Sequence, residues 1–131
     1  MTGQAAVLLA ALMLTHFLGD FTPLASARMQ DAKAAGTPIG PIAAHALIHA
    51  ALLGLTVALI ARPSVQTVVA AMAIQFWTHL GLDWGKGRLG GAHPDLADPG
   101  QQAFWTALGF DQFLHGLVLV WIVWLVYWLP G

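Results

Sequence analysis

The sequence contains no cysteine, no glutamate and no asparagine, and only 11 of its 131 residues are charged. Without cysteine there are no disulfides, thiolate metal sites or cysteine nucleophiles. Charged residues make up 8%, against roughly 25% in a soluble domain, while 58% of the residues are hydrophobic. A soluble chain this short cannot hide so much apolar surface, and a net charge of -1 gives no nucleic-acid-binding footprint. The composition predicts an integral membrane protein whose main partner is the lipid bilayer, with no nucleic-acid partner.

Apolar runs divide the chain into candidate membrane spans, each of which needs about 20 mostly apolar residues. Four stretches qualify, over residues 4–21, 39–61, 64–84 and 103–128. Arg62 and Pro63 separate the second span from the third so closely that the two should form an antiparallel hairpin. We expect a short amphipathic interfacial helix within 24–35 and a long Gly- and Pro-rich loop over 85–99. The predicted fold is all-α, one membrane domain over residues 1–131 that forms an up-down antiparallel bundle of four transmembrane helices.

The few basic residues predict the orientation of the chain. Arg28 and Lys33 lie in the first loop and Lys86 and Arg88 in the third, whereas the second loop has Arg62 alone. Because cytoplasmic loops are enriched in lysine and arginine, we expect loops one and three in the cytoplasm and both termini outside.

The ionisable residues inside the spans occur in pairs. Each span carries one pair spaced i, i+4, so both members lie on one face of their helix. In an up-down bundle all four pairs fall in the cytoplasmic half, in two layers about 6 Å apart. The layer nearer the cytoplasm comprises Asp20, His45, Asp83 and Asp111, and the deeper layer comprises His16, His49, His79 and His115.

Burying these groups in a bilayer is costly. An Asp at the centre of a spanning helix costs about 2.5–3.5 kcal/mol, and three carboxylates in one layer repel one another. A divalent cation would remove both problems, and helical bundles hold such ions with pairs of this kind on facing helices. Imidazole and carboxylate ligands suit zinc, iron or manganese. We therefore predict a metal site for one or two of these ions, formed by the eight residues as ligands or as supporting groups.

Several of these polar residues are also candidates for chemistry. Asp20, Asp83 and Asp111 are candidate catalytic residues, as metal ligands or as a general base. Lys86, three residues after Asp83, is a fourth candidate, which would pair with a substrate phosphate or with Asp83 itself. Groups that would support the ligands are Gln75, Gln112, Thr15 and Thr78.

Four segments of the chain carry a family resemblance: HFLGDF at 16–21, HALIHA at 45–50, HLGLDWGK at 79–86 and FDQFLHGL at 110–117. They resemble the small bacterial membrane proteins of domain-of-unknown-function family 3307. The resemblance covers nearly the whole chain and includes all four His and Asp pairs together with Lys86. It implies the fold and a location in the bacterial inner membrane, and it implies no established activity.

These patterns leave four functions open. The first is a metal-dependent membrane enzyme, a hydrolase or an oxidoreductase, that acts on a lipid-like or interfacial substrate. The second is a transporter or channel for a metal ion or a proton, which needs a polar path through the other leaflet, and the sequence there offers only scattered Thr, Ser and Gln unless a homo-oligomer forms the pore. The third is a haem protein with two axial histidines. The fourth is a structural or assembly subunit whose polar layer only specifies helix pairing.

Overall fold

A computed structural model describes residues 3–128, which are almost entirely helical. The elements are α1 (Gly3–Phe21), α2 (Ala27–Ala35), α3 (Ile39–Ile60), α4 (Val65–Ala92), η1 (Pro94–Leu96) and α5 (Gln102–Trp128). Four of them, α1, α3, α4 and α5, are long and apolar enough to cross a membrane. The described residues contain no strand, and the predicted all-α, four-span fold is confirmed.

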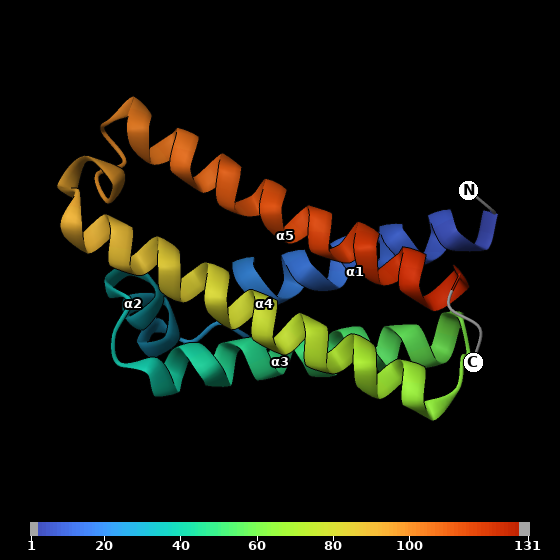
Figure 1. Ribbon diagram of the computed structural model, residues 1–131. Helices are drawn as coiled ribbons and strands as arrows, with labels where there is room; N and C mark the ends of the chain where they lie inside the picture. Colours follow the sequence, from blue (N-terminus) through green and yellow to red (C-terminus); the bar gives the residue numbers. More distant parts are fainter. Residues whose placement is uncertain (1–2, 129–131) are drawn as a thin grey trace.

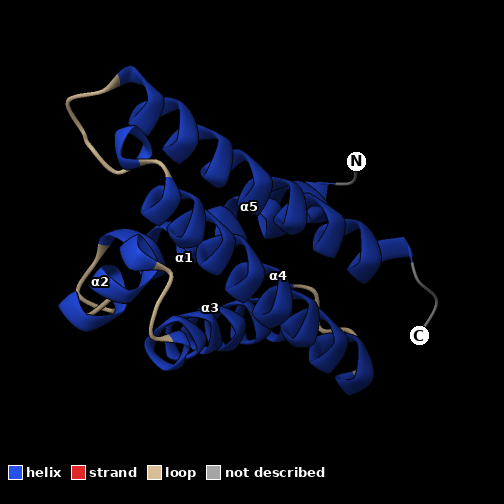
Figure 2. Cartoon of the chain, turned by 60° about the vertical axis from the view of Figure 1, so that its left-hand side comes forward, coloured by secondary structure: helices blue, strands red, loops and turns tan. Residues whose placement is uncertain are grey.

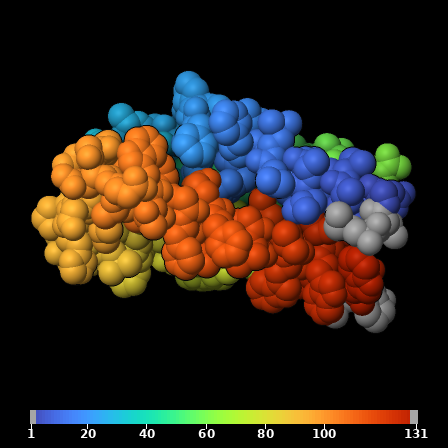
Figure 3. All heavy atoms as spheres, turned by 90° about the horizontal axis from the view of Figure 1, so that it is seen from above, coloured from blue at the N-terminus to red at the C-terminus, as the bar shows by residue number. Residues whose placement is uncertain are grey.

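The four long helices run up and down in an antiparallel bundle (Figure 1). The start of α1, the end of α5 and the turn between α3 and α4 lie at one end, which we call the termini end. Helix α2 and η1 lie at the opposite end, the α2 end, as Figures 1 and 2 both show. Helix α3 packs most extensively against α4, as the predicted hairpin requires, and α1 packs between α3 and α5. The α1–α5 pair forms the face seen in Figure 3.

Large apolar side chains cover the outside of the bundle. Leu59, Trp77 and Trp121 are 64%, 68% and 48% exposed, and most other outward positions on the long helices are also apolar. A soluble protein rarely exposes so large a contiguous apolar surface. With four helices of sufficient length, this surface indicates a multi-pass membrane protein.

Helix α4 is longer than the sequence predicted. The first, second and fourth spans begin and end within a residue of the expected bounds, but α4 continues past Trp84 to Ala92. The glycine-rich stretch 85–91, expected as a loop, is therefore helical. A glycine inside a helix costs about 1 kcal/mol relative to alanine, which tertiary packing can offset, and here α2 packs against this part of α4.

The packing of α2 on α4 explains two of the glycines. Gly36 ends α2 in the left-handed conformation with φ 68°, which favours glycine. A Cβ atom on Gly87 would overlap the backbone of Lys33 and Gly36. The predicted helix after α1 is confirmed, and it lies against α3 and α4, where its Ala32 and Lys33 are buried.

Candidate metal centre

The four deeper histidines form a closed ring in the middle of the bundle, one from each long helix. The ring centroids of His16 and His49 are 5.0 Å apart, those of His49 and His79 are 3.9 Å apart, and those of His79 and His115 are 4.4 Å apart. His115 closes the ring at 5.1 Å from His16. The i, i+4 pattern predicted this layer. Its close packing has a local cause as well, because a Cβ atom on Gly19 would overlap the His49 imidazole.

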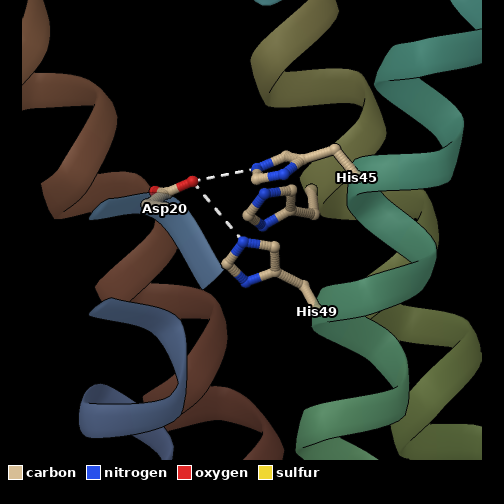
Figure 4. Close-up of side chains that lie close together, drawn as sticks. Asp20, His45 and His49 are labelled. Atoms are coloured by element: carbon tan, nitrogen blue, oxygen red, sulfur yellow. Dashed lines mark hydrogen bonds and ion pairs between the residues drawn. The ribbon is translucent and has the colours of Figure 1, made fainter. Parts of the chain in front are cut away.

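The second layer lies toward the α2 end and holds the carboxylates. Asp20 Oδ1 lies 2.9 Å from His45 Nε2 and 3.4 Å from His49 Nε2, and both contacts are drawn in Figure 4. Asp83 Oδ2 lies 3.6 Å from the same His45 nitrogen. Asp20, His45 and Asp83 are all buried, so these contacts form in a site with little access to solvent.

Lys33 of α2 also belongs to this layer, which the sequence analysis did not predict. Its ammonium group donates to Asp20 Oδ1 at 2.8 Å and lies 2.9 Å from His45 Nε2 and 3.4 Å from Asp83 Oδ2. The side chain is 8% exposed. The sequence predicted Lys33 only as a basic residue of the first loop. No signal in its immediate sequence would have revealed it, because the contact depends on how α2 packs.

Asp111 lies at the side of this layer and pairs with Lys86. The Lys86 ammonium donates to Asp111 Oδ2 at 2.8 Å, and the Gln112 amide donates to the same oxygen at 3.3 Å. The expected alternative pairing of Lys86 with Asp83 does not occur. Because α4 stays helical through Lys86, this side chain extends toward α5 instead. Three buried carboxylates thus face two ammonium groups, and one negative charge stays uncompensated while the imidazoles are neutral.

His115 and Asp83 face one another across the site. His115 Nδ1 lies 2.8 Å from the backbone carbonyl oxygen of Asp111. A carbonyl only accepts, so Nδ1 carries a proton, and in the neutral ring Nε2 then presents a lone pair. That nitrogen lies 4.0 Å from Asp83 Oδ1. Neither atom has a hydrogen-bond partner among the described residues, so two buried acceptors face each other.

Further unpaired nitrogens surround this point. His49 Nε2, His79 Nε2 and both ring nitrogens of His16 are buried and make no hydrogen bond within residues 3–128. His79 Nε2 lies 3.3 Å from Asp83 Oδ2. Buried polar atoms are nearly always paired, so this group of buried imidazole nitrogens and carboxylate oxygens is a candidate place for a cation.

Two groups of side chains have the geometry to hold a metal ion. In each group, ligand atoms from all members lie within 4.8 Å of one another. The groups are Asp20, His45, His49 and His79, and His79, Asp83 and His115. His16 and Asp111, also predicted as ligands, lie beside these groups and outside them.

The predicted supporting residues divide in two. Gln75 contacts His79, with its amide nitrogen 3.3 Å from Nδ1, and Gln112 donates to Asp20 as well as to Asp111. Thr15 and Thr78 donate to backbone carbonyls of their own helices. The two glutamines therefore contact the site, and the two threonines do not.

A pocket of about 260 Å³ reaches the site from the α2 end. Its polar lining includes Asp20, Gln30, Lys33, Lys86 and Gln112, and its apolar lining includes phenylalanines and leucines of α1, η1 and α5. The pocket reaches the carboxylate layer directly, and it provides a route for a small polar group to the buried residues.

Comparison with known proteins gives a family and no activity. Residues 8–130 match the family described as Protein of unknown function (DUF3307). The chain belongs to that family. No curated protein and no solved structure matches it.

Proposed function

We propose that this DUF3307 protein is a membrane-embedded metalloenzyme with one divalent transition-metal ion held by His79, Asp83 and His115. The observation that carries the proposal is the contact between His115 Nε2 and Asp83 Oδ1. A cation between the two facing atoms would pair both of them, and the backbone hydrogen bond of His115 would keep its Nε2 lone pair directed at that cation.

The neighbouring ligand group contains a cation already. Lys33 contacts Asp20 Oδ1 and His45 Nε2, two of the atoms that would bind a second ion there. The ammonium and a metal ion would compete for these atoms, so we propose one ion per chain.

The ligand set favours an enzyme. Two histidines and one carboxylate leave a coordination position open, as in catalytic zinc and non-haem iron sites. A bound ion of this kind would supply a Lewis acid that polarises a substrate oxygen or activates a water molecule. Asp20, at the floor of the 260 Å³ pocket, is placed to accept a proton, and Lys86 is placed to bind an anionic group. The mouth of the pocket would face the cytoplasmic interface under the expected orientation.

Two observations argue against a transporter and against a haem protein. The termini end is filled by aliphatic side chains such as Leu8, Val57 and Ile122, and this gives a transporter no polar path through one chain. The imidazoles of the ring contact one another directly, which leaves little room for a porphyrin between them.

The test is elemental analysis of the protein purified in mild detergent. We expect about one zinc, iron or manganese ion per chain, lost in His115→Ala and in Asp83→Asn. His93→Ala is the matched control, because His93 is exposed in the loop before η1 and should retain the ion. A protein that contains no metal under several growth conditions would refute the ligand assignment. A metal-loaded protein that carries ions into proteoliposomes would replace the enzyme by a transporter.

A further inference from the structure

An apolar groove between α4 and α5 continues from the pocket at the metal centre. One part of about 260 Å³ is lined by Gly81, Gly85 and Leu114 together with Lys86 and Asp111. A second part shares Gly81 and Leu114 and continues between tryptophans of both helices toward the middle of the bundle. Lys86 also lines the pocket at the metal centre, so the groove and that pocket meet at its side chain.

The glycines of α4 keep this groove open. A Cβ atom on Gly81 or on Gly85 would meet nothing within 4 Å. Close helix packing, which explains Gly87, therefore does not explain these two positions. Because a Cβ atom at either position lies in open space, we expect a larger side chain there to occupy the groove.

The two compartments differ in polarity. The pocket at the metal centre is lined by the ammonium groups of Lys33 and Lys86 and by the carboxylate of Asp20, and each ammonium group is paired with a carboxylate, Lys33 with Asp20 and Lys86 with Asp111. The groove has Lys86 and Asp111, which neutralise each other, and is otherwise apolar. The side chain of Lys86 is 31% exposed, so its ammonium group is accessible to a second partner.

We propose that the pocket and the groove together bind a single-chain amphiphile with a phosphate headgroup. This molecule would be the substrate of the proposed enzyme, so the inference rests on the proposed function. The phosphate would lie in the pocket beside the partly exposed ammonium group of Lys86 and near Asp20 of the carboxylate layer. Phosphate oxygens suit this position because they accept from ammonium groups and bind divalent ions. The hydrocarbon chain would lie along Gly85 and Gly81 between α4 and α5.

The binding test uses native mass spectrometry of the detergent-purified protein with three probes. Oleoyl lysophosphatidic acid has the headgroup and the chain, monooleoylglycerol has the chain alone, and inorganic phosphate has the headgroup alone. We expect one molecule of the lysophosphatidic acid per chain, bound at least about tenfold more tightly than monooleoylglycerol, since one charge-assisted hydrogen bond accounts for such a factor. Inorganic phosphate at the same concentration should not displace it.

Variants test the two compartments separately. Gly85→Leu should weaken the binding of both lipid probes about tenfold or more. Gly81→Leu repeats the test if the first variant does not fold. Gly109→Leu is the control, because Gly109 is exposed on α5, has open space at its Cβ position and does not line the groove. Lys86→Met should remove most of the preference for the phosphate probe and leave monooleoylglycerol binding unchanged.

The outcomes distinguish this proposal from the metal proposal when metal content is measured on the same samples. Equal binding of the two lipid probes would mean that bulk lipid covers the groove, and it would overturn the inference even in a metal-loaded protein. Binding unaffected by Gly85→Leu and Gly81→Leu would also overturn it. Selective binding to a protein without metal would support the lipid site and refute only the metal assignment.

Discussion

The termini end and the α2 end of the bundle are formed by the same four helices, but their interiors have opposite chemistry. At the termini end the interior consists of aliphatic side chains, such as Leu8, Leu53 and Ile122. Toward the α2 end nine buried polar or charged residues of the described range 3–128 lie among apolar ones. In a bilayer, lipid tails are as apolar as leucine, so the aliphatic end is held by close packing alone. At the polar end each group needs a partner, and this requirement restricts how the helices are arranged.

The difference has a functional meaning. Hydrogen bonds between membrane helices are worth about 0.6 kcal/mol on average, which is small compared with the cost of burying ions. A bundle made only for stability could use aliphatic packing at both ends. The concentration of carboxylates, ammonium groups and imidazole nitrogens at one end therefore supports the proposed metal site over a purely structural role. Four substitutions test this contrast, from the largest expected effect to the smallest.

Lys33→Ala should cause the largest loss of stability. Removing one member of a buried ion pair leaves an uncompensated charge and costs about 3–5 kcal/mol, and Lys33 contacts both Asp20 and Asp83. Thermal unfolding in detergent measures the loss, and Arg28→Ala on the exposed face of α2 is the control. If metal ions reach two per chain in the variant, the lysine blocks a second site. An unchanged unfolding temperature would show that the ammonium is not part of the buried layer.

Leu8→Ala tests the aliphatic end. The cavity should lower the free energy of unfolding by about 2 kcal/mol. This is at the lower end of values for soluble proteins, because a leucine that leaves the bundle enters lipid instead of water. Leu8 is fully buried and lies far along α1 from the polar layers. Metal content should therefore stay at the wild-type level. A parallel loss of metal would show that the two ends do not behave independently.

Gln75→Met tests the support of one ligand with little change in volume. Gln75 contacts His79 Nδ1, and loss of such a supporting contact typically lowers metal affinity roughly tenfold or more. Competition with a chelator of known affinity measures this change. Gln66→Met, at an exposed position of the same helix, should have no effect. An equal affinity in both variants would remove Gln75 from the site.

Val120→Ala should have the smallest effect. Val120 is 50% exposed on the outer face of α5 at the aliphatic end, so its side chain contacts lipid and not another helix. We expect the free energy of unfolding, measured by thermal unfolding, to change by less than about 0.5 kcal/mol. A larger effect would reveal a helix partner on this face, as in an oligomer.

The sequence was sufficient for most of the fold and for the depth of the polar residues. Apolar runs of spanning length gave three helices to within a residue, since every backbone group in a bilayer must be paired inside the segment. The sequence-based prediction was wrong at the end of α4. The frequent glycines there predicted a loop, but the packing of α2 against this segment keeps it helical. For the same reason the prediction assigned Lys86 an incorrect alternative partner.

The i, i+4 spacing by itself determined that the two ionisable residues of each pair share one helix face, and the place of each pair within its apolar span determined that the four pairs share one depth. Only the tertiary structure decided which atoms meet. Lys33 enters the polar layer because Gly36 and Gly87 let α2 approach α4. His115 presents a lone pair to Asp83 because its other nitrogen is bound to a carbonyl. Contacts of this kind join residues far apart in the chain, and they depend on helix packing that local sequence patterns do not encode.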